Sequence, residues 1–193
     1  MSMSVKELKQ FRDNLERLKD KAPEVMEEIL VGEGTFAVRQ ARSIVTNQKK
    51  VNTGAYRYNF HTGDRSRPAY ATAQMHDGTK PRKQGKTWLI DVYNNLDYAS
   101  YLEMGFRSHW VPGKYLSPTV LARVYANQKA KAVAEGKSPP KEIPMGIYVG
   151  PYKGYVNGIW ALRTAMRRTE MTQASRIQRK FERIIKEELE KGL

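Results

Sequence analysis

The stretch KTWLIDVYNNLDYASYLEMGF, residues 86–106, constrains the fold of this chain more than any other part. Its first half alternates apolar and polar side chains with the period of two that is typical of a β-strand. Asn94, Asn95 and Asp97 then interrupt the alternation and offer side-chain acceptors for a helix start. Apolar residues at helical spacing follow, and Gly105 is a natural helix stop. The stretch therefore predicts a strand, a tight turn and a short helix.

An amphipathic helix is expected over residues 4–21, where Ser4 and Glu7 form a capping box. Its apolar side chains recur at steps of three and four and form a narrow stripe, which includes Leu8, Phe11, Leu15 and Leu18. Pro23 fits the first turn of a second helix, predicted over residues 23–47 with a kink at its two glycines. A stripe this narrow is expected to pack on a surface of the same chain or of a neighbouring subunit.

The remaining elements are expected to form a small, mostly antiparallel sheet and two further helices. Strands are predicted at residues 55–61, 87–93 and 145–149, and helices at residues 118–134 and 159–191. The last helix is expected to cross one face of the sheet and to bury Trp160, Leu162 and Met166. The sequence thus predicts an α+β fold with long N-terminal and C-terminal helices, in a chain whose length of 193 residues suits one domain.

Residues 63–85 are polar, basic and rich in turn residues, which is typical of a long loop or an open hairpin. Because the stretch has few apolar anchors, we expect it to be mobile in the free protein, with a short strand at residues 69–75 as one possibility. Six basic side chains in and beside the loop are candidates for contact with DNA: Arg65, Arg67, Lys80, Arg82, Lys83 and Lys86.

Basic charge is concentrated in two parts of the chain. The formal net charge is +14, and residues 49–86 and 163–183 together carry +12 of it. Clustering of this kind indicates an anionic partner, either nucleic acid or an acidic protein surface. A solvated surface that aids solubility explains the charge equally well, since no aromatic–basic nucleic-acid motif is visible.

The residue patterns of an enzyme are absent from the sequence. The chain has no cysteine, and its three histidines lie in separate predicted loops without the spacing of metal ligands. Asp91, Asp97 and Glu103 are close in sequence, but they are expected on a strand, a cap and a helix surface, so we expect no two-metal nuclease site. No apolar run reaches the roughly 18 residues that span a bilayer, and the charged start lacks the apolar region of a signal peptide. We therefore expect no catalysis, no cofactor and no membrane contact.

Three short motifs, in this order along the chain, carry a resemblance to a known family. They are V-x-T-G-x-x-R at Val51–Arg57, N-x-x-x-Y-A-x-Y-L-E-x-G at Asn94–Gly105, and A-L-x-x-A at Ala161–Ala165. In order and spacing they resemble the minor tail components of long-tailed bacteriophages, the head–tail joining, tail completion and neck proteins. The resemblance covers roughly residues 23–193. Residues 107–158, which have a predicted helix of their own, then form an insertion where members of the family have a brief loop.

The resemblance implies a structural protein without turnover and without a cofactor. It would form a homo-oligomeric ring at the head–tail junction of the virion, assembled in the host cytoplasm, that joins a tail to a DNA-filled capsid. Its partners would be other neck, connector or tail proteins, and its basic loops would contact packaged DNA through the phosphates, independently of sequence. A non-specific nucleic-acid-binding module is the alternative that the net charge favours.

The apolar stripes of the first and last helices are the expected assembly surface. Each lies near one end of the chain and exceeds what a small sheet can cover, and uncovered stripes of this kind are usually buried on a partner. The alternative is that the two stripes pack on each other within one chain.

Overall fold

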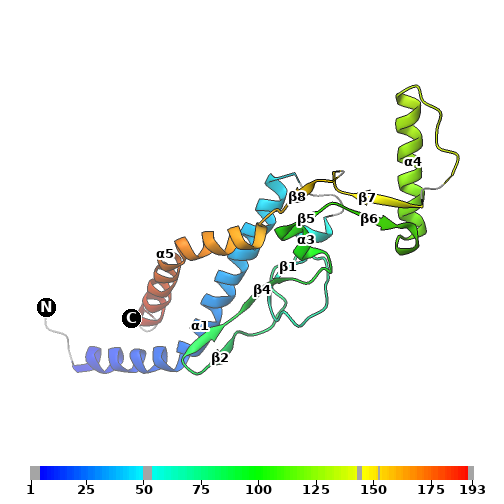
Figure 1. Ribbon diagram of the computed structural model, residues 1–193. Helices are drawn as coiled ribbons and strands as arrows, with labels where there is room; N and C mark the ends of the chain where they lie inside the picture. Colours follow the sequence, from blue (N-terminus) through cyan, green and yellow to red (C-terminus); the bar gives the residue numbers. More distant parts are fainter. Residues whose placement is uncertain (1–4, 50–53, 143–144, 152, 191–193) are drawn as a thin grey trace. The chain divides into compact units, whose positions relative to one another are not determined.

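The computed structural model describes residues 5–49, 54–142, 145–151 and 153–190, and the side chains of residues 5–8 and 189 lie outside that description. The chain divides into two compact units, which are described separately below and are coloured along the sequence in Figure 1. The core unit comprises Met1–Glu103 with Ile159–Leu193, and the ribbon unit comprises Met104–Gly158.

Two long helices, α1 (Val5–Asn47) and α5 (Ala161–Glu190), pack along each other in opposite directions in the core unit, as Figure 1 shows in blue and orange. Three ion pairs mark this contact, and they join Lys21 to Glu188, Glu28 to Lys180 and Glu33 to Arg176. The guanidinium group of Arg176 also lies 3.7 Å from the ring centroid of Phe36. The two predicted terminal helices therefore stabilise each other within one subunit.

The expected break near residue 22 does not occur, because α1 is one continuous helix that includes Pro23. A proline removes one backbone hydrogen bond from a helix. Pro23 is exposed, so water can satisfy the carbonyl oxygen that loses its donor. Val25 and Ile29, in the following turns, are buried and favour continuation of the helix. The predicted capping box at Ser4 lies outside the described residues.

The strands of the core unit form two short antiparallel pairs instead of one sheet. One pair joins β1 (Phe60–Gly63) to β4 (Asp91–Asn94), and the other joins β2 (Arg82–Gln84) to β3 (Thr87–Leu89). The strand predicted over residues 87–93 is thus divided between two pairs at Ile90. The prediction of an α+β fold with small antiparallel strands and long terminal helices is confirmed.

Residues 55–58 form a helical turn, α2 (Ala55–Tyr58), where a strand was expected. Gly54 precedes the turn with a left-handed backbone, φ 82°, which glycine adopts without strain. The turn places Tyr56 in the core, with its ring centroid 5.0 Å from that of Phe60. The alternating aromatic residues therefore do not share one strand, and the strand itself begins only at Phe60.

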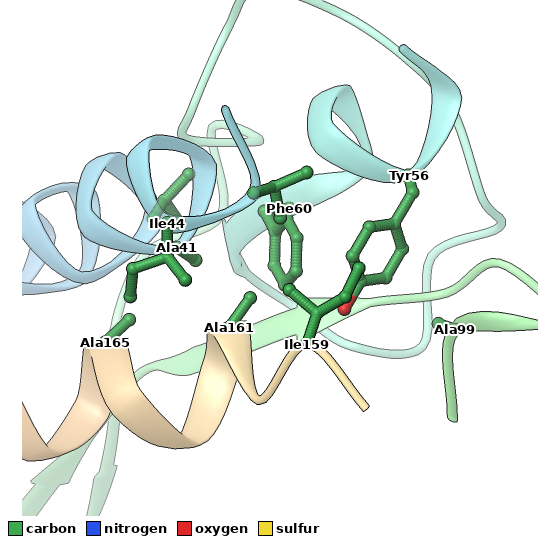
Figure 2. Close-up of a cluster of buried hydrophobic side chains, with 10 residues drawn as sticks. Ala41, Ile44, Tyr56, Phe60, Ala99, Ile159, Ala161 and Ala165 are labelled. Atoms are coloured by element: carbon green, nitrogen blue, oxygen red, sulfur yellow. The ribbon is translucent and has the colours of Figure 1, made fainter. Parts of the chain in front are cut away.

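The hydrophobic core lies where the last turns of α1 meet the first turns of α5, as the close-up in Figure 2 shows. Ala41, Ala161 and Ala165 are fully buried, and their small side chains let the two helices approach closely. Larger side chains complete the cluster, namely Ile44, Tyr56, Phe60 and Ile159.

The expectation that α5 buries three large side chains against a sheet is wrong for two of them. Trp160 is 40% exposed and Met166 is 46% exposed, and Leu162 is half-buried. The reason is that α5 turns Ala161 and Ala165 toward α1, so Met166 faces outward, while Trp160 precedes the first residue of the helix.

The ribbon unit is built from two antiparallel strand pairs and one helix. Strand β5 (Gly105–Arg107) follows α3 (Ala99–Met104) and pairs with β8 (Tyr155–Asn157), and β6 (His109–Pro112) pairs with β7 (Gly146–Val149). The single turn η1 (Gly113–Tyr115) and α4 (Pro118–Ala134) connect β6 to β7.

Helix α4 has the predicted bounds, and Ser117 caps it by accepting a hydrogen bond from the backbone N–H of Val120. Gly105 ends α3 with φ 87°, as predicted for a helix stop. Strands β5, β6 and β8 were not predicted. They alternate too briefly, over three or four residues each, to stand out from the irregular sequence around them.

Gly34 is the point at which α1 comes closest to β1, and its replacement by alanine should destabilise the protein. An added Cβ would lie 2.2 Å from Oγ1 of Thr62, which is fully buried and donates to the carbonyl oxygen of Asp91 at 2.9 Å. We expect Gly34→Ala to cost about 1–3 kcal/mol in the free energy of unfolding, because the contact is overpacked.

Gly32→Ala is the matched control for this substitution, and urea unfolding measures both. Gly32 is exposed, and its added Cβ would meet only the terminal nitrogen of the long Lys180 side chain, at 3.3 Å. The gain in helix propensity should then stabilise the protein by about 0.5–1 kcal/mol. Changes of the same sign at both positions would contradict the close approach at Gly34.

Candidate assembly site

The described parts of the three motifs meet at the amino-terminal end of α5. The side-chain amide of Asn94 donates to the carbonyl oxygen of Tyr56 at 2.9 Å, and the Tyr56 hydroxyl donates to Oε2 of Glu103 at 2.9 Å. Oε1 of Glu103 accepts from the backbone N–H of Arg163 at 2.9 Å, so this carboxylate caps α5. Glu103 therefore joins three elements, where an exposed position on a helix was predicted.

The environment of Tyr56 fits this structural role. Burial, reinforced by the charge of Glu103, raises the pKa of Tyr56, so the phenol stays protonated and donates its hydrogen bond. Backbone hydrogen bonds from Ile159 to Leu102 and from Trp160 to Glu103 tie the same two segments together. The motifs thus specify how the core is connected. Val51 and Thr53 of the first motif lie outside the described residues.

Arg42, on α1, is a buried cation that the sequence prediction missed. It is 8% exposed, and its guanidinium group donates to the carbonyl oxygens of Phe60, Ala73 and Gln74 at 2.7–2.8 Å, and more weakly to that of Tyr58. Burial lowers the pKa of Arg42, but an arginine stays charged at physiological pH. One signal was present in the sequence: Arg42 lies inside the apolar stripe of Val38, Ala41 and Val45.

Asp77 is a second buried polar anchor of the loop at residues 64–81. Its side chain is fully buried and accepts from the backbone N–H groups of Asp64 and Thr79 at 2.8 Å and from the hydroxyl of Tyr93 at 2.9 Å. Burial disfavours the carboxylate, but these hydrogen bonds outweigh burial and lower the pKa of Asp77 to about 2.

These contacts are anchors that the sequence prediction did not include. The expectation of a mobile loop assumed that anchors must be apolar, whereas Arg42 and Asp77 hold the loop to the core through buried polar groups. The mobility itself stays a prediction, which hydrogen exchange measures. The strand considered for residues 69–75 does not form, and His76 makes a single bridge to Thr62. The ring of His61, itself buried, stacks on Tyr70 with centroids 4.1 Å apart.

The Asp77 carboxylate should make stability fall at acidic pH. Its pKa of about 2 in the folded state is below the value of roughly 3.9 expected for an unfolded chain, so the unfolded state binds more protons between these values. The stabilisation is complete above about pH 4 and is lost as the pH falls toward 2, by about 2 kcal/mol. Urea unfolding between pH 2.5 and 5 measures it.

The Asp77→Asn variant should lose this part of the pH dependence, and Asp97→Asn, at an exposed position, is the matched control. If the free energy of unfolding of Asp77→Asn falls with decreasing pH as steeply as that of the natural protein, the Asp77 carboxylate is not the cause of the fall.

The six basic residues predicted to face DNA are partly neutralised within the chain. Three of them form ion pairs, which are Arg67 with Asp77, Lys80 with Glu27 and Arg82 with Asp91. The ammonium group of Lys83 lies 5.7 Å from a ring centroid of Trp88. Within the described part of the chain, the exposed side chains of Arg65 and Lys86 form no ion pair. Contact between this loop and DNA stays a prediction.

The predicted contact stripe on α1 is only partly covered by α5. Phe11 and Leu15 are 44% and 45% exposed, and Leu18 is half-buried, while the side chain of Leu8 lies outside the described residues. Phe181 on α5 is 45% exposed. The two helices pack on each other, and they still leave what we call the apolar edge, namely Phe11, Leu15, Met26 and Phe181. Burial of this edge by a partner stays a prediction.

The acidic residues considered for a metal site make other contacts. Asp91 pairs with Arg82, and Glu103 caps α5. Among the residues that the structure describes, no group of three His, Asp or Glu side chains is placed to hold a metal ion. A search of the same residues finds no helix with the length and apolar character needed to cross a membrane.

Comparison with known proteins identifies the family. The family model described as "Bacteriophage HK97-gp10, putative tail-component" matches residues 9–105, half of the chain. The chain therefore belongs to the HK97-gp10-like family, and the resemblance inferred from the motifs is confirmed. The family describes a structural component of the bacteriophage tail. No curated protein and no solved structure matches the chain.

Proposed function

We propose that this protein acts at the head–tail junction, as a tail completion or neck component, and that it assembles as a homo-oligomeric ring that joins the tail to the DNA-filled capsid. Its mechanism is association without turnover, and it needs no cofactor. Its place is in the virion, after assembly in the host cytoplasm. Membership of a tail-component family supports the general role.

The observation that carries the proposal is the apolar edge of the helix pair. Phe11, Leu15, Met26 and Phe181 are large apolar side chains, exposed by 37–45% and spread along two long helices. A subunit that assembles with others needs such a surface, because apolar burial is the main driving force of association. Contacts along this edge would join each subunit to its neighbours or to other neck, connector or tail proteins.

The ribbon unit and the basic loop complete the proposal. The family match ends at residue 105, and the ribbon unit begins at Met104, which supports a single family domain with an insertion at about residues 107–158. The exposed Arg65 and Lys86 would be the members of the loop most available to packaged DNA. The alternative of a nucleic-acid-binding module would require tight, salt-dependent binding of DNA by the isolated monomer.

Electron microscopy of particles made without this protein tests the proposed stage of assembly. We expect DNA-filled heads and complete, separate tails, because heads and tails would each form normally and only the junction between them would be missing. Supplying the purified protein to the mixture should restore joined particles. Joined particles in its absence, or a lack of tails altogether, would assign the protein to a different step.

A further inference from the structure

Helix α5 contacts α1 at two separate places. Ala161, Ala165 and Thr169 are buried in the first contact, and the second begins at Arg176, which pairs with Glu33. Residues 170–175, between the two contacts, are all exposed, and because they make about one and a half turns, every side of the helix faces solvent there. Figure 1 shows that α5 changes direction near its middle. The helix therefore leaves α1 after the first contact and returns to it at the second.

The bend in α5 is held by polar contacts alone. The hydroxyl groups of Thr169, Thr172 and Ser175 each donate to a carbonyl oxygen three or four residues earlier, at 2.9–3.1 Å. Bonds of this kind favour bending of a helix. Arg176, at the end of the segment, donates to the carbonyl oxygen of Thr169 at 3.1 Å. Since residues 170–175 bury no apolar surface, they form a hinge that can straighten without disturbing the core.

The second contact joins two complementary surfaces. It uses residues 21–33 of α1 and residues 176–188 of α5, which are connected by the three ion pairs described above. The side chains of Arg176 and Glu33 are only 19% and 16% exposed, and Ile29 is buried in the same contact. Because every copy of the protein carries both surfaces, the same contact can form between two copies.

We propose that in the assembled protein residues 176–188 of α5 pack on residues 21–33 of α1 in a second copy, instead of on α1 of their own chain. The hinge straightens, and the exchanged contact keeps the ion pairs and the buried surface that it has within one chain. Exchange of an identical element in this way is a low-cost route from monomers to oligomers. Each copy gives one segment and receives another, so the exchange can be repeated from copy to copy and closes a ring when the rotation allows. This inference rests on the proposed ring and names the surfaces that form it.

Mixing two full-length variants of opposite charge tests the exchange. The first variant carries Glu28→Lys and Glu33→Arg on α1, and the second carries Arg176→Glu and Lys180→Glu on α5. In either variant alone, the second contact places like charges together, whether it forms within one chain or between identical copies. In an equimolar mixture, every exchanged contact between the two variants pairs opposite charges. Sedimentation velocity should show that the mixture associates more strongly than either variant alone, on the order of tenfold or more.

Three controls separate the exchange from misfolding and from a general effect of charge. A single chain with all four changes restores the contact within one chain and should keep the thermal midpoint of the natural protein. Arg167→Glu and Arg168→Glu, at exposed positions on α5, make the same change in net charge as the second variant and should not associate with the first. Circular dichroism shows whether each variant is folded. If a double variant unfolds, Glu28→Lys and Lys180→Glu alone repeat the mixing test with the pair of Arg176 and Glu33 intact.

Failure of the exchange and failure of the proposed function have different signatures. If the mixture of folded variants stays monomeric, the exchange is wrong, although the natural protein can still join heads to tails in the particle assay. Association of either variant alone as strong as that of the mixture would assign self-association to another surface, and it would overturn the exchange as well. If the particle assay shows no role in joining, the proposed function fails even where the two variants associate on mixing.

Discussion

Replacing Arg42 by methionine is expected to lower the free energy of unfolding by about 3–5 kcal/mol, a large part of the stability of a domain of this size. Methionine replaces the aliphatic stem of arginine, but it lacks the guanidinium group and donates no hydrogen bond. The substitution would leave the carbonyl oxygens of Phe60, Ala73 and Gln74 without the donors that they have now. Each buried acceptor that loses its partner costs roughly 1–3 kcal/mol. The loop should then detach from α1.

Arg39→Met is the matched control, because Arg39 lies one turn earlier on α1 and is exposed. Its effect should be within about 0.5 kcal/mol of zero. Arg42→Lys should fall between the two, since an ammonium group cannot reach the same carbonyl oxygens as a planar guanidinium group. Urea unfolding measures all three variants. A loss below about 1 kcal/mol in Arg42→Met would mean that water replaces the missing donors and that the loop is not held by this residue.

The helices could be predicted from the sequence because their signals are local. Each signal can be read within one or two turns of a helix. The signals are the apolar stripe of α1, the cap and proline at the start of α4, and the apolar repeat of α5. The error at Pro23 has a physical cause. A proline inside a helix removes a hydrogen bond and clashes with the carbonyl group of the preceding turn. Burial of Val25 and Ile29 in the following turns favours the continuous helix, and this burial cannot be read from the proline itself.

The polar contacts that hold the loop could not be predicted in the same way. Asp77 binds groups that lie 13 and 16 residues away, at Asp64 and Tyr93, and no periodicity in the sequence relates them. The partners of Glu103 are farther still, at Tyr56 and Arg163. Such contacts depend on how the elements are folded together, so the same residues look like solvent-exposed charge in the sequence. Arg42 is the exception, since it interrupts an apolar stripe.

The candidate assembly surface was predictable as a stripe, but its extent was not. The spacing of Leu8, Phe11, Leu15 and Leu18 marks one face of a helix, and it cannot tell how much of that face α5 covers. The structure shows that the cover is partial, with Leu18 half-buried and Phe11 and Leu15 nearly half exposed. For the basic loop, the sequence overestimates the charge that is available to a partner, because ion pairs within the chain neutralise part of it.

The apolar edge gives the prediction with the largest effect on function. The double variant Phe11→Glu and Leu15→Glu should fold with an unchanged thermal midpoint, because both side chains are 44–45% exposed in the subunit. If this edge is buried on a partner in the assembled junction, two carboxylates would then be placed in an apolar contact without counter-charges, which is strongly unfavourable. We expect the yield of joined particles to fall on the order of a hundredfold or more, which is the effect of removing two central contact residues.

Two single substitutions by glutamate are the controls for the double variant. Ile29→Glu, at a position that is 4% exposed between α1 and α5, should unfold the subunit and sets the signature of core damage. Met171→Glu on α5 replaces a side chain that is 76% exposed and outside the apolar edge, and it should leave both folding and joining intact. Joining is measured by adding each purified variant to separate heads and tails and counting joined particles by electron microscopy. If the double variant unfolds as Ile29→Glu does, Phe11 and Leu15 belong to the core of the subunit. If it folds and joins normally, assembly uses another surface, because a contact that buried this edge could not accommodate two added charges.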